Sequence, residues 1–203
     1  MKHKTKIFVL HGGCTHSSRK KYETFLKSIT ISLHKRKHWR KEYLTKKLKK
    51  YEIIAPTMPL KENAKYKDWK IIFEKYMQQM DEDIILIGES LGGIFLAKYL
   101  SENKIKKNIL GTYLVAPPFD NELSNEELVG GFNLPKDISL LQKQNKHLHL
   151  FFSKDDPVVN IEQAKKYQQQ LEEKTIHIFE SKNGHFRVEK FPELIKLIKK
   201  ECR

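Results

Sequence analysis

The sequence predicts an α/β protein, a three-layer α/β/α sandwich built on a mostly parallel, six-stranded sheet. Short apolar runs recur along the chain and alternate with segments of helical periodicity. Strands that are covered on both faces read as such continuous apolar runs, and strands separated by helices favour parallel pairing. We expect the six strands over residues 6–11, 51–55, 84–87, 110–116, 148–152 and 175–179.

Between these runs, apolar residues three or four positions apart predict the helices that cover the sheet. The clearest case is segment 66–80, where Tyr66, Trp69 and Phe73 fall on one face. Core packing explains that stripe without a cofactor. Further helices are expected over 19–29, over 36–50, from residue 91 to about 103, after Asn160, and from near Pro192.

The polar segment 117–146 predicts a small cap on this sandwich. Within it, Ser124-Asn125-Glu126-Glu127 matches a capping box, so a short helix should begin there and end at Gly130-Gly131. No internal repeat or linker interrupts the pattern along the chain. We therefore expect a single domain over residues 1–203 that carries one cap-like segment.

Composition narrows the class of partner. The formal net charge is +14, but only five of the 39 basic residues are Arg, and the lysines are spread over nearly every segment. A nucleic-acid binder more often concentrates Arg and aromatic residues on one face, so no nucleic-acid partner is expected. The charges of segment 36–50 are interpreted as a solvated face, with contact to a membrane surface as the weaker alternative. The basic surface should modestly steer anionic small molecules.

Location and assembly follow from similar arguments. No stretch is long and apolar enough to insert into a membrane, and the first residues run into a strand without an apolar signal region. The two cysteines, Cys14 and Cys202, are too few for a disulfide framework. We expect a cytoplasmic protein, present as a monomer or a weak homodimer.

The strongest functional signal is the stretch from Gly88 to Gly92, Gly-Glu-Ser-Leu-Gly, which lies between a predicted strand and a predicted helix. In that context the pattern predicts a nucleophile elbow, a tight turn that raises Ser90 above the sheet. Gly88 and Gly92 remove side chains that would clash at the turn. The backbone N–H of Leu91 is then free to donate to an oxyanion. The plainer alternative is a turn whose serine merely caps the helix.

Three other groups follow strand ends, and ligands of such sheets bind at the carboxyl ends of strands. They are His11-Gly12-Gly13-Cys14, the pair Asp155-Asp156, and His185. We expect Ser90 to attack an acyl carbonyl, His185 to act as general base, and a carboxylate to orient His185. Gly13 is the first choice for the second oxyanion donor and Cys14 the second choice.

Several alternatives stay open. The residues leave undecided whether Asp155 or Asp156 orients His185, and Asp120 is a reserve acid partner. His11 is expected to be structural, and His16 either lines the site or lies in a loop. No pair of the nine histidines combines H-x-x-x-H spacing with a nearby Glu on a convincing helix, so neither a metal nor another cofactor is expected.

The quoted motifs resemble the α/β-hydrolase superfamily over almost the whole chain. More narrowly, the sequence is similar to the compact serine hydrolases that include retinoblastoma-binding protein nine and its bacterial YdeN-like relatives. That resemblance rests on these stretches: Phe8-Val-Leu-His-Gly-Gly13, Pro56-Thr-Met-Pro59, Trp69, Gly88-Glu-Ser-Leu-Gly-Gly93, Asp155-Asp-Pro-Val-Val159 and Gly184-His-Phe186. It implies that Ser90 is the nucleophile, His185 the base, and Asp156, directly before Pro157, the acid.

The sequence departs from the family in three places. Glu89 precedes the serine where the family often has His, and Asn160 stands where related loops often have Pro. The inserted segment around residues 28–50 is longer and more basic than expected. A negative charge at Glu89 is expected either to raise the pKa of His185 or to repel anionic substrates.

These observations predict a serine hydrolase of the carboxylesterase kind that acts on small-molecule acyl esters through an acyl-enzyme. A thioesterase, an amidase or an acyltransferase would use the same intermediate. A non-catalytic binding protein on the same fold is the rival from outside the enzymes.

Overall fold

A computed structural model describes residues 5–34, 37–80, 82–124 and 126–202. Its centre is one six-stranded sheet in which every neighbouring pair of strands is parallel. The strand order is β2-β1-β3-β4-β5-β6. The strands are β1 (Lys6–Leu10), β2 (Glu52–Ile54), β3 (Asp83–Glu89), β4 (Asn108–Val115), β5 (Leu148–Ser153) and β6 (Ile176–Phe179). The predicted fold class and all six strands are confirmed.

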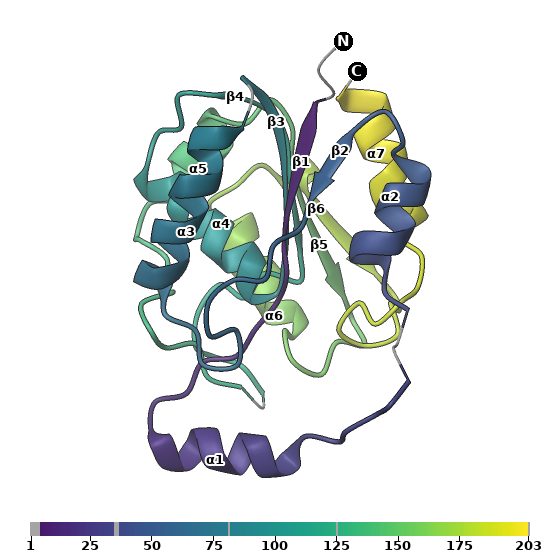
Figure 1. Cartoon of the computed structure of the whole chain (residues 1–203). Coiled ribbons are helices and arrows are strands. Elements are labelled where there is room, and N and C mark those ends of the chain that lie inside the picture. Colours follow the sequence, from purple (N-terminus) through teal and green to yellow (C-terminus); the bar gives the residue numbers. More distant parts are fainter. Residues whose placement is uncertain (1–4, 35–36, 81, 125, 203) are drawn as a thin grey trace.

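Helices cover both faces of the sheet (Figure 1). On one side lie α3 (Tyr66–Gln79), α4 (Leu91–Glu102) and α5 (Ser139–Lys143). On the other side lie α2 (Leu44–Lys47) and α7 (Pro192–Glu201). The remaining helical elements are α1 (Arg19–Ser28), the π-helical turn η1 (Trp39–Tyr43), α6 (Ile161–Gln168) and the 3₁₀ turn η2 (Glu173–Thr175).

The middle of the sheet holds the core. The side chains of β3 from Ile84 to Ile87 are fully buried, as are nearly all those of β1. On the α3 side, Phe73 of α3 packs edge-on against Phe95 of α4, with ring centroids 5.3 Å apart. Because these side chains must stay buried, the register of β1 against β3 is fixed. The carboxyl ends of β1 and β3 lie where the strand order reverses, and ligands of such sheets bind at that position.

Two predicted helices differ in the structure. The segment predicted as one helix over 36–50 is broken into η1 and α2, whose inner side chains Trp39 and Leu44 are buried as expected. No helix begins at the capping box, although Asn125 lies outside the described residues. Instead, Glu127 pairs with Thr15 in an isolated antiparallel bridge, and the short helix of this region is α5.

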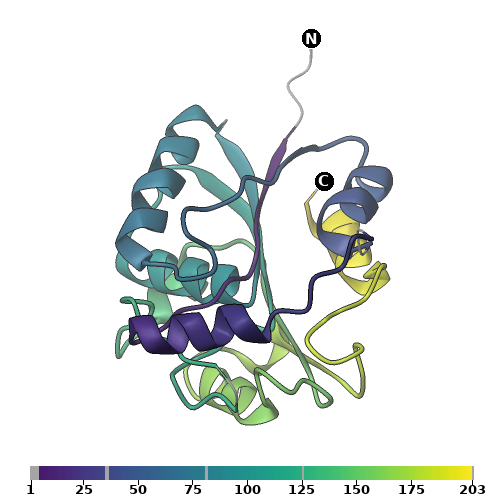
Figure 2. The same ribbon diagram turned by 60° about the horizontal axis from the view of Figure 1, so that its bottom comes forward.

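The helix expected over residues 19–29 is present as α1, but it does not join the layers. It lies beyond the carboxyl ends of the strands, outside the two helical layers (Figures 1 and 2). None of its side chains is buried. In the described part of the chain, no helix has both the length and the apolar character needed to cross a membrane.

Candidate active site

Ser90 occupies a strained turn between β3 and α4. Its backbone angles are φ 52° and ψ −119°, a region that residues other than glycine rarely adopt. The N–H of Ser90 donates to the carbonyl oxygen of Val115 (2.8 Å), which anchors the turn to β4. Such strain costs on the order of 1–3 kcal/mol and persists only where the surroundings impose it.

Gly88 and Gly92 allow the close backbone approach that this turn requires. A Cβ on Gly92 would lie 2.6 Å from the carbonyl oxygen of His11 and 2.8 Å from that of Leu10. A Cβ on Gly88 would lie 2.7 Å from the carbonyl carbon of Gly92. Because all three contacts are with backbone atoms, none of these clashes can be relieved by rotating a side chain. The sequence assigned both glycines to the elbow for this reason.

The side chains of His185 and Asp156 are in direct contact. His185 lies in the turn after β6, and its Nδ1 is 2.7 Å from Oδ2 of Asp156, in the loop after β5. The other oxygen of Asp156 accepts hydrogen bonds from the N–H groups of Val158 (2.8 Å) and Val159 (3.0 Å). The Asp156 side chain is fully buried. These contacts hold the proton on Nδ1 of His185 and leave its Nε2 as an acceptor.

The pKa of His185 is raised above its ordinary value. Burial of the ring by itself lowers the pKa, but the hydrogen bond and the charge of Asp156 outweigh it. The charges of Glu89 and Glu126 add to the rise. Glu89 directly precedes Ser90 in the chain, and Glu126 lines the space at Ser90.

Asp155 has a different role from its neighbour. Its carboxylate accepts hydrogen bonds from the hydroxyls of Ser153 (2.5 Å) and Ser181 (2.5 Å) and from the N–H groups of Lys182 (3.1 Å) and Gly184 (2.9 Å). These bonds hold its pKa far below the usual range. Asp155 therefore fixes the turn that carries His185, while Asp156 contacts the imidazole.

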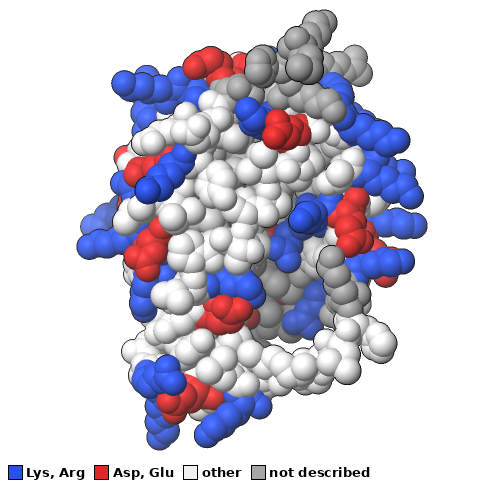
Figure 3. Space-filling model, in the orientation of Figure 1, with Lys and Arg blue, Asp and Glu red and all other residues white. Residues whose placement is uncertain are grey.

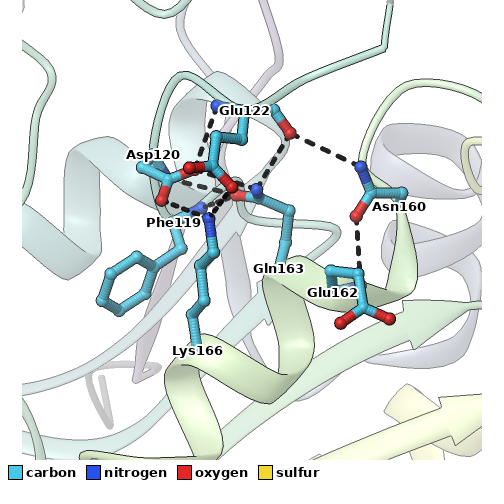
Figure 4. Close-up of polar contacts among 7 residues, drawn as sticks. All are labelled: Phe119, Asp120, Glu122, Asn160, Glu162, Gln163 and Lys166. Atoms are coloured by element: carbon cyan, nitrogen blue, oxygen red, sulfur yellow. Dashed lines mark hydrogen bonds and ion pairs between the residues drawn. The ribbon is translucent and has the colours of Figure 1, made fainter.

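The reserve acid partner, Asp120, is engaged elsewhere. Its carboxylate accepts from Lys166 Nζ (2.5 Å) and from Gln163 Nε2 (3.0 Å), both on α6 (Figure 4). The buried Gln163 also accepts from the N–H groups of Phe119 (2.6 Å) and Asp120 (3.1 Å). Asp120 and Gln163 thus anchor the start of the cap segment on α6, while Nδ1 of His185 is taken by Asp156.

The candidate oxyanion donors differ in how free they are. The N–H of Cys14 donates to the carbonyl oxygen of Lys61 (2.8 Å) and is not available. Burial raises the pKa of the Cys14 thiol to about 12, so it is not a second nucleophile. Gly13 and Leu91 both line the space at Ser90. Leu91 is the first residue of α4, where backbone N–H groups have no acceptor within the helix.

Glu89 has partners that the sequence did not reveal. Its buried carboxylate contacts Nε of Arg40 (2.6 Å) and Nε2 of His38 (3.2 Å), which come from the inserted basic segment. Burial alone would raise the pKa of Glu89, but the hydrogen bond of His38 and the charge of Arg40 lower it. Glu89 is therefore ionised, and it raises the pKa of His185, one of the two effects expected for it.

The two loop histidines are placed differently. His11 accepts from the N–H of Met58 at Nε2 (2.8 Å) and donates from Nδ1 to the carbonyl oxygen of Gly12 (2.5 Å), the structural role expected for it. His16 lines a cavity beside the site, and its Nε2 is buried without a hydrogen-bond partner.

The space above Ser90 is nearly closed. The void at the serine is about 10 Å³ and is roofed by residues of the cap segment, including Glu126 and Leu128. Next to it lies a cavity of about 520 Å³ beneath α1, which shares Glu126, Glu127 and Val158 with the void. The sequence pattern does not indicate that Glu126 lines this void, because a capping box predicts a helix start.

Among the described residues, no group of three or more His, Cys, Asp or Glu side chains is arranged to hold a metal ion. The described polar groups of the site are a serine on a strained turn and a histidine bonded to a buried carboxylate.

The parallel sheet, the helical layers and the serine on a strand-to-helix elbow define the α/β-hydrolase class. The sequence model of the serine hydrolase family matches residues 32–198. The chain therefore belongs to the serine hydrolase family.

Similarity to individual proteins agrees with this assignment. The chain is 26% identical to serine hydrolase RBBP9 of Rattus norvegicus over 149 residues, which are 73% of this chain and 77% of that protein. The ydeN gene product of B. subtilis has a similar structure, with a TM-score of 0.76, 18% identity and 98% of each chain covered. A lipase-esterase related protein of Clostridium acetobutylicum ATCC 824 has a TM-score of 0.60 at 13% identity, covering 98% of this chain and 95% of that one. At these identities the two structures support the fold alone.

Proposed function

We propose that the protein hydrolyses acyl esters through Ser90, His185 and Asp156. The observation that carries the proposal is the 2.7 Å contact between His185 Nδ1 and a buried Asp156 carboxylate, in a protein whose serine stands on a strained elbow. That contact selects the tautomer in which Nε2 of His185 accepts a proton. The raised pKa of His185 favours the imidazolium that forms during reaction.

The reaction follows from these assignments. Ser90 Oγ attacks the ester carbonyl as its proton passes to Nε2 of His185, and the N–H groups of Gly13 and Leu91 donate to the oxyanion. The bond from carbon to the alcohol oxygen breaks, and the alcohol leaves with the proton from His185. A water molecule then attacks the acyl-Ser90 ester, and His185 again accepts and returns the proton.

The test is covalent labelling with a fluorophosphonate probe, followed by turnover of p-nitrophenyl esters of increasing acyl length. We expect wild-type protein to be labelled at Ser90. Ser90→Ala should lose the label and on the order of 10⁶ in kcat, as when a hydrolase nucleophile is removed. Ser101→Ala, on the remote end of α4, is the matched control and should keep both. Absence of labelling of the wild type between pH 6 and 9 would favour a binding protein on the same fold.

A further inference from the structure

The segment formed by α1 and residues 29–34, called the α1 arm below, exposes apolar side chains in an unusual concentration. Leu26 and Ile29 are each 40% exposed, Ile31 is 79% exposed and Leu33 is 95% exposed. The other large exposed apolar residues in the described part of the chain are scattered singly, at Leu60, Ile71 and Ile178. Scattered residues of this kind are ordinary on a protein surface, but a contiguous row marks a contact surface.

The α1 helix lacks the packing that usually stabilises a helix of its length. It has ten residues and no buried side chain. Helices this short are marginal in water, and in proteins their stability comes mostly from an apolar face packed against something. Tyr22 and Phe25 contact His16, with ring centroids 5.4 and 4.9 Å apart, but Leu26 and Ile29 remain 40% exposed. A surface that accepts these side chains would supply the missing packing.

The charges around the arm identify the kind of surface. Residues 19–41 include nine Lys or Arg residues and a single Glu, and of the nine, Arg19, Lys21 and Arg40 are paired with carboxylates. Lys20 and Lys27 are exposed on α1, and Lys37 and Lys41 are exposed beyond it. In Figure 3 the lower edge of the molecule shows Lys and Arg, with some acidic surface between them, at the α1 end, and uncharged surface extends from there. Exposed apolar side chains bracketed by lysines are the pattern of a segment that lies on an anionic lipid surface.

The arm is also connected to the candidate active site. Its inner face, with Lys21 and Phe25, lines the cavity of about 520 Å³ that adjoins the void at Ser90. Lys21 Nζ contacts the Glu127 carboxylate (2.5 Å), which also accepts from the hydroxyl and the N–H of Ser17. Glu127 belongs to the cap segment that roofs the serine. The arm therefore covers a cavity that adjoins the void at Ser90.

We propose that the α1 arm docks the protein onto anionic lipid surfaces, and that the cavity beneath α1 receives acyl esters held in such a surface. The second half of this inference rests on the proposed esterase function, whereas the docking does not. A second copy of the chain fits the arm less well, because two protomers of net charge +14 would bring basic surfaces together. A lipid headgroup layer supplies both the negative charge and the apolar phase.

Docking is tested by co-sedimentation with vesicles of phosphatidylcholine alone and of phosphatidylcholine with phosphatidylglycerol. The protein used is the Ser90→Ala variant beside the wild type, so that binding is measured whether or not Ser90 reacts. We expect both to bind the anionic vesicles and to release them as salt rises, with little binding to the neutral vesicles. Ile31→Asp/Leu33→Asp should weaken binding by about tenfold or more. Ile71→Asp, a 56% exposed position on α3, is the matched control and should bind like the wild type.

Three results would overturn the docking: no binding to anionic vesicles, undiminished binding by the double variant, or a dimer in solution that the double variant dissociates.

Whether the cavity receives esters from the lipid surface is tested separately, by comparing hydrolysis of a soluble and an embedded ester. The double variant should hydrolyse a soluble short-chain ester at the wild-type rate, but should turn over an acyl ester embedded in anionic vesicles about tenfold more slowly or worse. If the double variant and the wild type hydrolyse the embedded ester at equal rates, the inference that the cavity receives esters from the lipid surface is wrong. If the soluble ester is not hydrolysed by wild-type protein, the proposed function fails while the docking result stands.

Discussion

Among the described residues, two histidine–carboxylate contacts are shorter than 3.2 Å, and they lie at opposite ends of the strands. At the carboxyl edge, His185 Nδ1 lies 2.7 Å from Asp156. At the amino edge, His149 Nε2 lies 2.8 Å from Glu201 at the end of α7, and His149 Nδ1 lies 2.8 Å from His177 Nε2. The pKa of His185 is raised, but the pKa values of His149 and His177 are both lowered.

The difference lies in what surrounds each pair. Burial lowers the pKa at both edges, but at His185 the fields of Glu89 and Glu126 add to that of Asp156. At His149 the Glu201 carboxylate opposes burial without overcoming it, and the charges of His147 and Lys200 lower the pKa further. A histidine bonded to a carboxylate is therefore not a sufficient sign of a general base. The serine elbow and the additional carboxylates distinguish the candidate active site from the remote pair.

The largest expected contrast comes from removing one carboxylate charge at each edge. Asp156→Asn should lower kcat/KM for a p-nitrophenyl ester by on the order of 10⁴, because the amide favours the wrong tautomer of His185. Glu201→Gln makes the same change at the remote pair and should leave kcat/KM within about twofold. Steady-state kinetics of both variants, with circular dichroism to verify folding, provide the comparison. Equal losses would mean that the roles of the two pairs have been assigned wrongly.

A smaller effect, on the pH dependence of kcat/KM, should separate the contributions of Glu89 and Glu126 to the pKa of His185. Glu89→Gln removes a negative charge that raises the pKa of His185, so the acidic limb of the kcat/KM profile should move to lower pH. The variant also leaves Arg40 without its buried partner, which lowers stability. Glu89→Gln/Arg40→Gln removes both charges and is the control for the loss of stability that an unpaired Arg40 causes. Glu126→Gln should shift the limb in the same direction but less. A pH–rate profile of Glu89→Gln that overlays the wild type would show that the field of Glu89 is not felt in catalysis.

Local patterns in the sequence were enough to predict the sheet and the elbow. The run Ile84–Ile87 and the glycines after it specify a buried strand and a tight turn through their own sterics. The structure keeps Ser90 at positive φ there. The position of Asp156 against His185 also agrees with the family resemblance, whereas the residues alone left Asp155 open.

Features that depend on distant partners were not predictable in this way. The capping box failed because the Glu127 carboxylate, which would have closed the box, is bound by Lys21 and Ser17 from another segment. The partner of Glu89 was missed because Arg40 precedes it by almost fifty residues, with no periodicity to relate the two. The exposure of α1 was missed because its apolar stripe is the same one that a packed helix would have.

The smallest expected effect is on the pH dependence of stability, where the two pairs should act with opposite sign. Because the folded pKa of His177 lies below the ordinary 6.5, the unfolded chain binds more protons at acid pH, and the fold loses stability as pH falls through that region. Because the folded pKa of His185 is raised, its contribution is present below 6.5 and is lost as pH rises through the folded pKa. Urea unfolding between pH 5 and 8 should thus show a shallower acid-side loss for His177→Gln and a smaller alkaline-side loss for His185→Gln. Each change in slope is bounded by about 1.4 kcal/mol per pH unit, the limit for one proton.

His34→Gln, an exposed position on the α1 arm, is the matched substitution. Slopes that change in the same direction for His177→Gln and His185→Gln would contradict the opposite electrostatic environments assigned to the two edges.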